Sequence, residues 1–318
     1  MEERSPGVLK KENEANRIVL VSFITNIFDI TIGVVVATIT GSVSVLAQSF
    51  QALADLTTSG TLVLGVKRSE KHANEEYPFG YGREVFFWVL VSALFMLVFT
   101  GGASIYLGIN RILNPSAIDS GWIAVIALVL GIITNGYAFS LSFKELRASD
   151  RNSSILSSIK SSSLLELKAS FLIDGAGMTA AIIGLVSVGL SLATGITIFD
   201  GVGSLFIGVM MTIFALLLIR DVKNFIVGKA ASKRTQRKIE RVAMSVKGVQ
   251  EVLDLRTMYL GSTRLLVVIE LHIDERLKTR SIEHLTDEVK KRILKRVPRV
   301  EIVQVEVETP DHELDKLD

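Results

Sequence analysis

The chain has 318 residues, of which 49% are hydrophobic, and its mean hydropathy is +0.44. It contains no cysteine, which excludes a disulfide framework and a thiolate metal site. The small net charge of +2 hides an asymmetry, because residues 17–219 are a series of long apolar stretches whereas the chain from Lys229 onward has the composition of a charged soluble domain. Residues 1–16 are mixed in charge and have no apolar core, so we expect a cytoplasmic lead and not a signal peptide.

Several apolar stretches are long enough to cross a bilayer, which takes about 20 residues of helix. They lie at residues 17–39, 44–67, 85–110, 122–144, 165–190 and 200–220. We therefore predict an α-helical membrane protein with six transmembrane helices over residues 17–225. Lysine and arginine concentrate at both ends of this region and in alternate loops, whereas the opposite loops contain only Arg111. By the positive-inside rule, both termini are expected in the cytoplasm.

Residues 229–310 alternate in the order helix, strand, strand, helix, strand. The segments are residues 233–246, 251–260, 263–273, 281–297 and 300–308. The second helix is expected to start at a Ser281 cap and to stop at Pro298. This order predicts a small cytoplasmic ferredoxin-like α+β domain, followed by a polar tail at residues 311–318.

Polar side chains interrupt the apolar stretches in a regular way. The second stretch carries three at i, i+3 and i+7, which are Gln48, Gln51 and Asp55. The fifth stretch carries three at i, i+4 and i+8, which are Glu166, Ser170 and Asp174. Each spacing places its three residues on one face of a helix. Asn26 and Asp29 likewise share a face of the first stretch, and Asn135 lies in the fourth.

Asp55 and Asp174 lie near the middle of their stretches, where an ionisable group is costly and is usually functional. Two such carboxylates, together with amide and hydroxyl oxygens, would neutralise and coordinate a divalent metal cation. For Asn26, Gln48 and Asn135, a structural hydrogen bond between helices is the simpler interpretation. Asp29 stays open between an ion pathway and such a bond.

Five segments, in chain order, carry a resemblance to a known family. They are "GSVSVLAQSFQALAD", "YPFGYGREVFFW", "FLIDGAG", "FDGVGSLFIGVMM" and "GVQEVLDLRTMYLGSTRLLVVIELHID". Over nearly its whole length the chain resembles the cation diffusion facilitators, also called the cation efflux or zinc transporter family. In that family a His/Asp-x-x-x-Asp pattern in spans two and five builds the transport site. The resemblance implies that Asp55 and Asp174 bind metal, with Gln51 and Ser170 standing where His or Asp is usual.

The resemblance further implies metal efflux from the cytoplasm by proton antiport with alternating access. A buried carboxyl group can hold a proton when no cation is present, which suits this exchange. Side chains that could assist as an accessory site or proton pathway are Asp29, Gln48, Asn26, Asn135 and Glu166. The runner-up is a membrane metal sensor or scaffold of the same fold that has lost transport. An enzyme is not expected, since the stretches contain no histidine and the chain has no phosphate-binding glycine loop.

The ligand set leaves the metal open. Imidazole suits Zn²⁺, whereas carboxylate and carbonyl oxygens suit Mn²⁺. An all-oxygen site therefore favours Mn²⁺ or Fe²⁺, while zinc is the commonest substrate of relatives, so Mn²⁺/Fe²⁺ and Zn²⁺/Co²⁺ both stay possible as substrates. No resident cofactor is expected.

The resemblance also implies a homodimer, and it suggests regulatory metal binding in the soluble domain. Candidate ligands there are His272, His284 and Glu308, although solvated or structural histidines are the simpler interpretation. The expected partners are the metal cation, protons and the lipid bilayer, and not nucleic acid. The expected location is a cell inner or plasma membrane.

Overall fold

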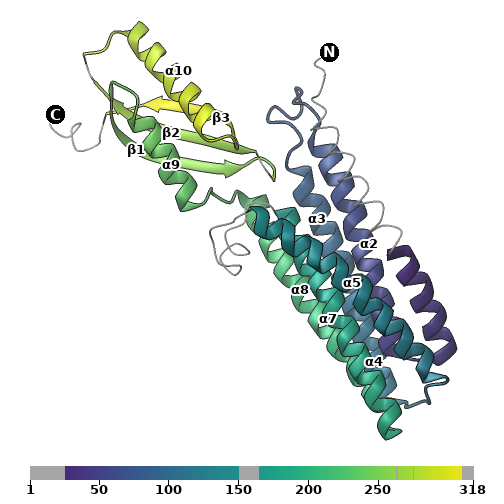
Figure 1. Ribbon diagram of the computed structural model, residues 1–318. Coiled ribbons are helices and arrows are strands. Elements are labelled where there is room, and N and C mark those ends of the chain that lie inside the picture. Colours follow the sequence, from purple (N-terminus) through teal and green to yellow (C-terminus); the bar gives the residue numbers. More distant parts are fainter. Residues whose placement is uncertain (1–25, 150–164, 263, 275, 310–318) are drawn as a thin grey trace, which may run out of the picture. The chain divides into compact units, whose positions relative to one another are not determined.

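The computed structural model describes residues 26–149, 165–262, 264–274 and 276–309 (Figure 1). Contacts within the chain divide it into two compact units. The first is helical. The second combines Val66–Phe86 with the chain from Lys223 onward.

Long helices build the first unit. They are Asn26–Thr40, α2 (Val43–Ser69), α3 (Glu84–Phe95), the π-helix η1 (Met96–Gly102), α4 (Ala103–Leu113), α5 (Gly121–Ser149), α7 (Leu165–Thr194) and α8 (Ile198–Val227). The segments α3, η1 and α4 follow one another without a break, and correspond to the predicted third span. The first part of the predicted span at 17–39 lies outside the described residues.

Of the described helices, four are both long and apolar enough to cross a membrane. They are Glu84–Leu113, Gly121–Lys144, Ile173–Thr194 and Ile198–Val227, with mean hydropathies between 1.9 and 2.6. These match the predicted spans three to six. Helix α2 has the length but is more polar, because it carries the amides and the carboxylate singled out above.

Small side chains form the centre of the helical unit. The buried cluster there is Ala47, Ala54, Met96, Ala176, Ala180, Ile207, Met211 and Ala215. Alanine at helix contacts lets the backbones approach closely, which is how helices associate where the surroundings are as apolar as the core. Large apolar side chains such as Phe99 and Phe206 instead point outward and are more than half exposed, at 55% and 62%.

Helices α4 and α8 approach each other through glycines. A Cβ atom added at Gly108 would lie 2.6 Å from the backbone nitrogen of Leu205 and 2.8 Å from the carbonyl oxygen of Gly201. Both neighbours are backbone atoms, so they cannot move aside without shifting the helix.

We expect Gly108→Ala to destabilise the protein by about 1–3 kcal/mol, the usual cost of overpacking a core. Thermal unfolding in detergent measures this. The matched control is Gly189→Ala on α7, where an added Cβ meets no atom within 4 Å. Equal unfolding temperatures for the two variants would contradict the close approach of α4 and α8.

A buried carboxylate on α8 holds the start of α2. Asp200 is 0% exposed and accepts hydrogen bonds from Ser42 Oγ at 2.7 Å and from the backbone N–H groups of Val43 at 2.8 Å and Ser44 at 3.0 Å. It therefore caps the N-terminus of α2, where the helix leaves N–H groups unpaired. Its charge is met by Arg111 of α4, whose Nε lies 3.5 Å from Asp200 Oδ2.

Arg111 extends this cluster to the neighbouring loops. Its guanidinium donates to the carbonyl oxygen of Ser116 at 3.0 Å and also to the carbonyl oxygen of Gly41. Gly41 has φ of +68°, a conformation that other residues rarely adopt. Arg111 thus ties α4 to the turn that precedes α2.

The second unit carries the predicted α+β fold. Its elements are α9 (Lys233–Met244), β1 (Val249–Tyr259), β2 (Leu265–Ile273), α10 (Thr279–Arg296) and β3 (Val300–Val307). The sheet order is β1-β2-β3, with β1 and β2 antiparallel and β2 and β3 parallel. The predicted order of helices and strands is confirmed. The Ser281 cap was wrong, because α10 begins earlier, at Thr279, and its N-cap residue Lys278 makes no side-chain cap hydrogen bond.

Alternate residues of β2 form the core of this domain. Val267, Ile269 and Leu271 are each 0% exposed, as are Ile239 of α9 and Val289 of α10. The two helices contact each other as well as the sheet, so they cover the same face of it. This strand was predictable because a run of apolar and β-branched residues follows a glycine-containing turn.

Candidate metal site

Helix α2 places an amide and a carboxylate one turn apart in the interior of the helical unit. Gln51 is 0% exposed and Asp55 is 6% exposed. Gln51 Nε2 donates to Asp55 Oδ1 at 2.7 Å and, at 3.3 Å, to the carbonyl oxygen of Ile173 on α7. The amide therefore fixes the orientation of the carboxylate and joins α2 to α7 at this level.

The other end of the same amide is unsatisfied. Gln51 Oε1 is buried and has no hydrogen-bond partner among the described residues. A buried acceptor without a partner costs about 1–3 kcal/mol. Because this oxygen belongs to a side chain already held against the Asp55 carboxylate, the site lacks a donor or a cation and not an acceptor.

Asp174 supplies the second carboxylate, from α7. It is partly buried and accepts a hydrogen bond from Ser142 Oγ of α5. The two carboxylates interact electrostatically, and Asp29 adds a smaller interaction with Asp55. The predicted pair of acids thus lies on two facing helices that share one polar interior.

Polar groups of three helices meet around Gly177 of α7. A Cβ atom placed there would lie 3.3 Å from Asp55 Oδ2 and would collide with Asn135 Oδ1. Gln48 Nε2 also faces this residue, 3.5 Å from its carbonyl oxygen. Only glycine leaves room for this arrangement, so Gly177 sets the distance between α7 and the side chains of α2 and α5.

Ser142 was not singled out from the sequence. Ser142 follows Asn135 by two helical turns, so the spacing i, i+7 could have placed both on the face that points to Asp174. Asn135 itself is 6% exposed, and its Nδ2 donates to the carbonyl oxygen of Gly131 at 2.8 Å. This hydrogen bond lies within α5, so the expected bond between helices stays a prediction for this residue.

Some predicted site residues are not part of this cluster. The side chains of Glu166 and Ser170 lie outside the described residues. Asp29 accepts a hydrogen bond from Thr134 Oγ1 at 2.8 Å and lines a separate cavity. Asn26 begins its helix and is not among the residues that line this cavity.

The predicted regulatory residues of the soluble domain lie on different elements. His272 is buried on β2 at 8% exposed, whereas His284 is exposed on α10. Glu308 follows the end of β3, and its backbone N–H donates to the carbonyl oxygen of Leu271 at 3.1 Å. Over the described ranges, no group of three or more His, Asp or Glu residues is placed to hold a metal ion.

Apolar helices around buried carboxylates, followed by a small α+β domain, are typical of membrane transport proteins for cations. Family comparison agrees with this class: residues 19–225 match the cation efflux transmembrane domain, and residues 231–309 match the cytoplasmic domain of cation efflux proteins. The chain belongs to the cation efflux family, the cation diffusion facilitators.

Named relatives are similar at low identity. The mouse (Mus musculus) mitochondrial proton-coupled zinc antiporter SLC30A9 is 24% identical over 244 residues, which are 76% of this chain and 43% of that protein. The chain therefore spans less than half the length of that relative. The cation-efflux pump FieF of Klebsiella pneumoniae is 24% identical over 267 residues, which are 83% of each chain. A solved structure of the MamM C-terminal domain, in a nickel form, is 21% identical, covers 25% of this chain and all of its own, and has a TM-score of 0.24.

Proposed function

We propose that the protein exports a divalent metal cation and binds it in the membrane between α2 and α7. In this proposal Asp55 and Asp174 supply the two negative charges, and Gln51 Oε1 and Ser170 Oγ complete an all-oxygen ligand set. The observation that carries the proposal is the unpartnered Gln51 Oε1 beside a buried carboxylate. A cation is the partner that would satisfy both groups at once, because it pairs with lone pairs and with charge.

The two carboxylates also suit proton antiport by alternating access. A carboxyl group in a low-dielectric interior is held either by a cation or by a proton. Neither Gln51 nor Ser170 titrates near neutral pH, so in this mechanism aspartates carry the protons: Asp55 and Asp174 at the metal site, aided by Asp29. Ser142 would orient Asp174 through its hydroxyl, as Gln51 orients Asp55.

The direct test is metal flux in proteoliposomes that contain the purified protein. Mn²⁺ and Zn²⁺ are supplied separately, with and without a pH gradient. Flux accelerated by a gradient of the expected direction supports export by antiport. Metal binding without any flux would instead support the alternative of a transport-deficient sensor or scaffold, which the lack of imidazole at residues 51 and 170 favours.

The ligand chemistry makes the metal preference testable at one residue. We expect Gln51→His to raise the affinity for Zn²⁺ relative to Mn²⁺ by about 10-fold or more, since imidazole suits Zn²⁺ better than an amide oxygen does. Competition binding of the two metals to wild type and variant measures the ratio. Thr57→His is the matched control, because Thr57 lies on the same helix but its hydroxyl donates to the carbonyl oxygen of Leu53 and not to the Asp55 carboxylate. The same ratio in both variants would place Gln51 outside the ligand set.

The remaining parts of the proposal follow the charge distribution and the family. Lysine and arginine residues that precede the first span and follow the last one in the sequence support cytoplasmic termini. Export then moves the metal out of the cytoplasm. We propose a homodimer in a cell inner or plasma membrane, with the metal and protons as substrates. Among the described residues no cluster of three His, Asp or Glu side chains supports a regulatory metal site within one chain.

A further inference from the structure

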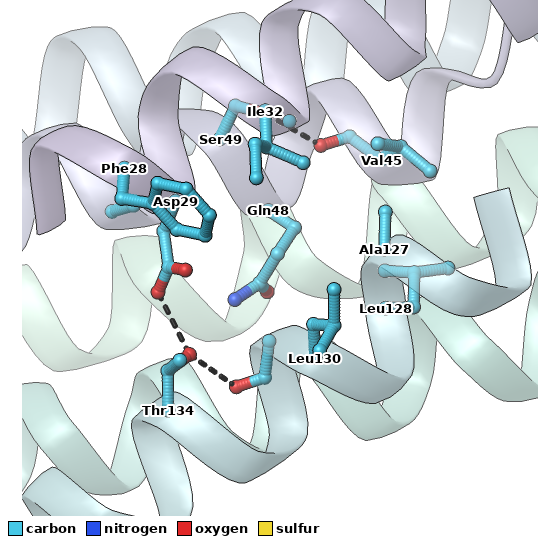
Figure 2. Close-up of a pocket in the computed structure, with 13 residues that line it drawn as sticks. Phe28, Asp29, Ile32, Val45, Gln48, Ser49, Ala127, Leu128, Leu130 and Thr134 are labelled. Atoms are coloured by element: carbon cyan, nitrogen blue, oxygen red, sulfur yellow. Dashed lines mark hydrogen bonds between the residues drawn. The ribbon is translucent and has the colours of Figure 1, made fainter. Parts of the chain in front are cut away.

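A cavity of about 60 Å³ lies between the Asn26–Thr40 helix, α2 and α5 (Figure 2). Most of its walls are apolar, with side chains such as Phe28, Ile32 and Leu128. A space of this size holds one or a few water molecules, since a single water needs about 10–15 Å³. The cavity belongs to the helical unit but not to the site between α2 and α7.

Polar groups converge at one place on this apolar wall. Figure 2 shows the Asp29 carboxyl group and the Gln48 amide pointing into the same part of the cavity, with the Thr134 hydroxyl beside them. Thr134 Oγ1 lies 2.8 Å from Asp29 Oδ2 and 3.1 Å from the carbonyl oxygen of Gly131. A hydroxyl has one proton, so it serves only one of these acceptors at a time.

The convergence is rich in acceptors and poor in donors. Gln48 Oε1 is buried without a hydrogen-bond partner in the described part of the chain. Its Nε2 lies 3.5 Å from the carbonyl oxygen of Gly177, which already takes up one of its two N–H groups. Ser49 also lines the cavity, but its hydroxyl donates its hydrogen bond to the carbonyl oxygen of Val45 at 3.0 Å. Oxygen lone pairs without donors are the lining that a cation requires.

The charge of the site selects the class of cation. Asp29 is the single ionisable residue among the thirteen that line the cavity, and none of those thirteen is cationic. One carboxylate neutralises one positive charge, so a monovalent cation leaves no net charge in the interior, whereas a divalent cation would leave one. Asp55 on α2 interacts electrostatically with Asp29 and, more strongly, with Asp174 on α7.

A polar partition separates the cavity from the proposed metal site. Gln48 lines the cavity and reaches Gly177, which itself faces Asp55. On α5, Thr134 faces Asp29 while the next residue, Asn135, packs against Gly177. The electrostatic interaction of Asp29 with Asp55 crosses this partition. A positive charge taken up in the cavity therefore weakens the hold of Asp55 on a metal, and metal binding weakens the hold of Asp29 on that charge.

We propose that this cavity is a binding site for the monovalent coupling cation, with Asp29 as the charged ligand and Gln48 Oε1 and Thr134 Oγ1 as neutral ones. The proposal deepens the export function proposed above. The coupling role of the cation rests on that function, whereas the binding of the cation does not. The cation is either a proton, held on Asp29 with water, or Na⁺. Both share the chemistry of one positive charge among oxygen acceptors.

Binding measurements on the full-length, metal-free protein test the site without transport. If the cation is Na⁺, replacing choline chloride by NaCl at constant pH raises the unfolding temperature of wild type, because a ligand bound only by the folded state stabilises it. If it is a proton, potentiometric titration between pH 9 and 5.5 shows one proton fewer taken up by Asp29→Asn than by wild type. An Asp in water titrates near 3.9 and would leave the uptake in that range unchanged.

Asp29→Asn, which keeps the shape of the side chain, is expected to abolish whichever response wild type shows. Ala127→Val narrows the cavity without altering its charge and should weaken the same response, which serves if the first variant does not fold. Asp119→Asn, an exposed carboxylate outside the helical interior, is the control and should respond like wild type. Identical responses of wild type and Asp29→Asn in both the sodium and the proton measurements overturn the site.

Coupling is then tested in proteoliposomes. Asp29→Asn should still bind the metal within about 3-fold of wild type and let it equilibrate, but a pH or sodium gradient should no longer accelerate its flux. Loss of metal binding as severe as that of Asp55→Asn would overturn a separate site and place Asp29 in the metal cage. If wild type moves no metal at all, the export proposal fails, while the binding measurements on metal-free protein still decide the cavity.

Discussion

Replacing Asp55 by Asn should reduce metal flux in proteoliposomes to the level of empty vesicles and weaken metal binding by at least about 100-fold. The loss exceeds the 10–100-fold typical of a residue that only supports a ligand. Asparagine has the size of aspartate and can still accept the hydrogen bond from Gln51, which now lies at 2.7 Å. The substitution removes the negative charge of a side chain that is only 6% exposed. A cation bound there has little water to compensate for the lost charge.

Two measurements accompany this variant. Its unfolding temperature in detergent should stay within a few degrees of wild type, which shows that flux is lost from a folded protein. Asp119→Asn, which changes an exposed carboxylate, should transport normally. Gradient-driven flux that persists in Asp55→Asn would contradict the placement of the metal at this residue.

Arg111→Met should lower the unfolding temperature by about 10 °C. Removing one partner of a buried ion pair costs about 3–5 kcal/mol, because the other charge stays buried without its partner. Here the change strands Asp200, which is 0% exposed, and takes the donor from the carbonyl oxygens of Gly41 and Ser116. Thermal unfolding of the purified protein, monitored by its intrinsic fluorescence or by the onset of aggregation, measures the effect.

A double-mutant cycle with Asp200→Asn separates the ion pair from the loss of other contacts. We expect Arg111→Met together with Asp200→Asn to cost clearly less than the sum of the single changes. Lys290→Met is the control, since Lys290 pairs with Asp287 on the surface of α10 at 3.7 Å and such pairs contribute about 0–1 kcal/mol. Additive single effects would show that Arg111 and Asp200 act independently.

The soluble domain was the easiest part to predict from the sequence. The strand-forming apolar residues of β2 and the helical periodicity of α9 and α10 are local patterns, and each element formed close to its expected bounds. The membrane helices were found by length and hydropathy for the same reason. The start of α10 was misplaced because Ser281 has the chemistry of a cap but lies inside the helix, after Thr279.

Only the part of the candidate site that depends on positions within one helix was predictable from the sequence. The spacing of Gln51 and Asp55 placed them on one face of α2, and the cost of an acid in a membrane pointed to Asp55 and Asp174. Which groups meet across helices depends on packing, which no local pattern contains. The hydrogen bond of Ser142 to Asp174 and the cap formed by Asp200 on α2 therefore appear only in the structure.

The π-helix η1 gives the third span a register that a regular α-helix of the same sequence would not have. Its hydrogen bonds skip one more residue than those of an α-helix, so it holds one residue in excess. Within it, Thr100 Oγ1 donates to the carbonyl oxygen of Phe50 at 3.1 Å, directly before Gln51. If the same residues instead formed a regular α-helix, with none deleted, the second half of the span would turn by about 100° relative to the first. Gly108 would then no longer face α8, and Arg111 would no longer face Asp200. The π-helix therefore sets the rotation that lets the first half of the span contact α2 and the second half contact α8.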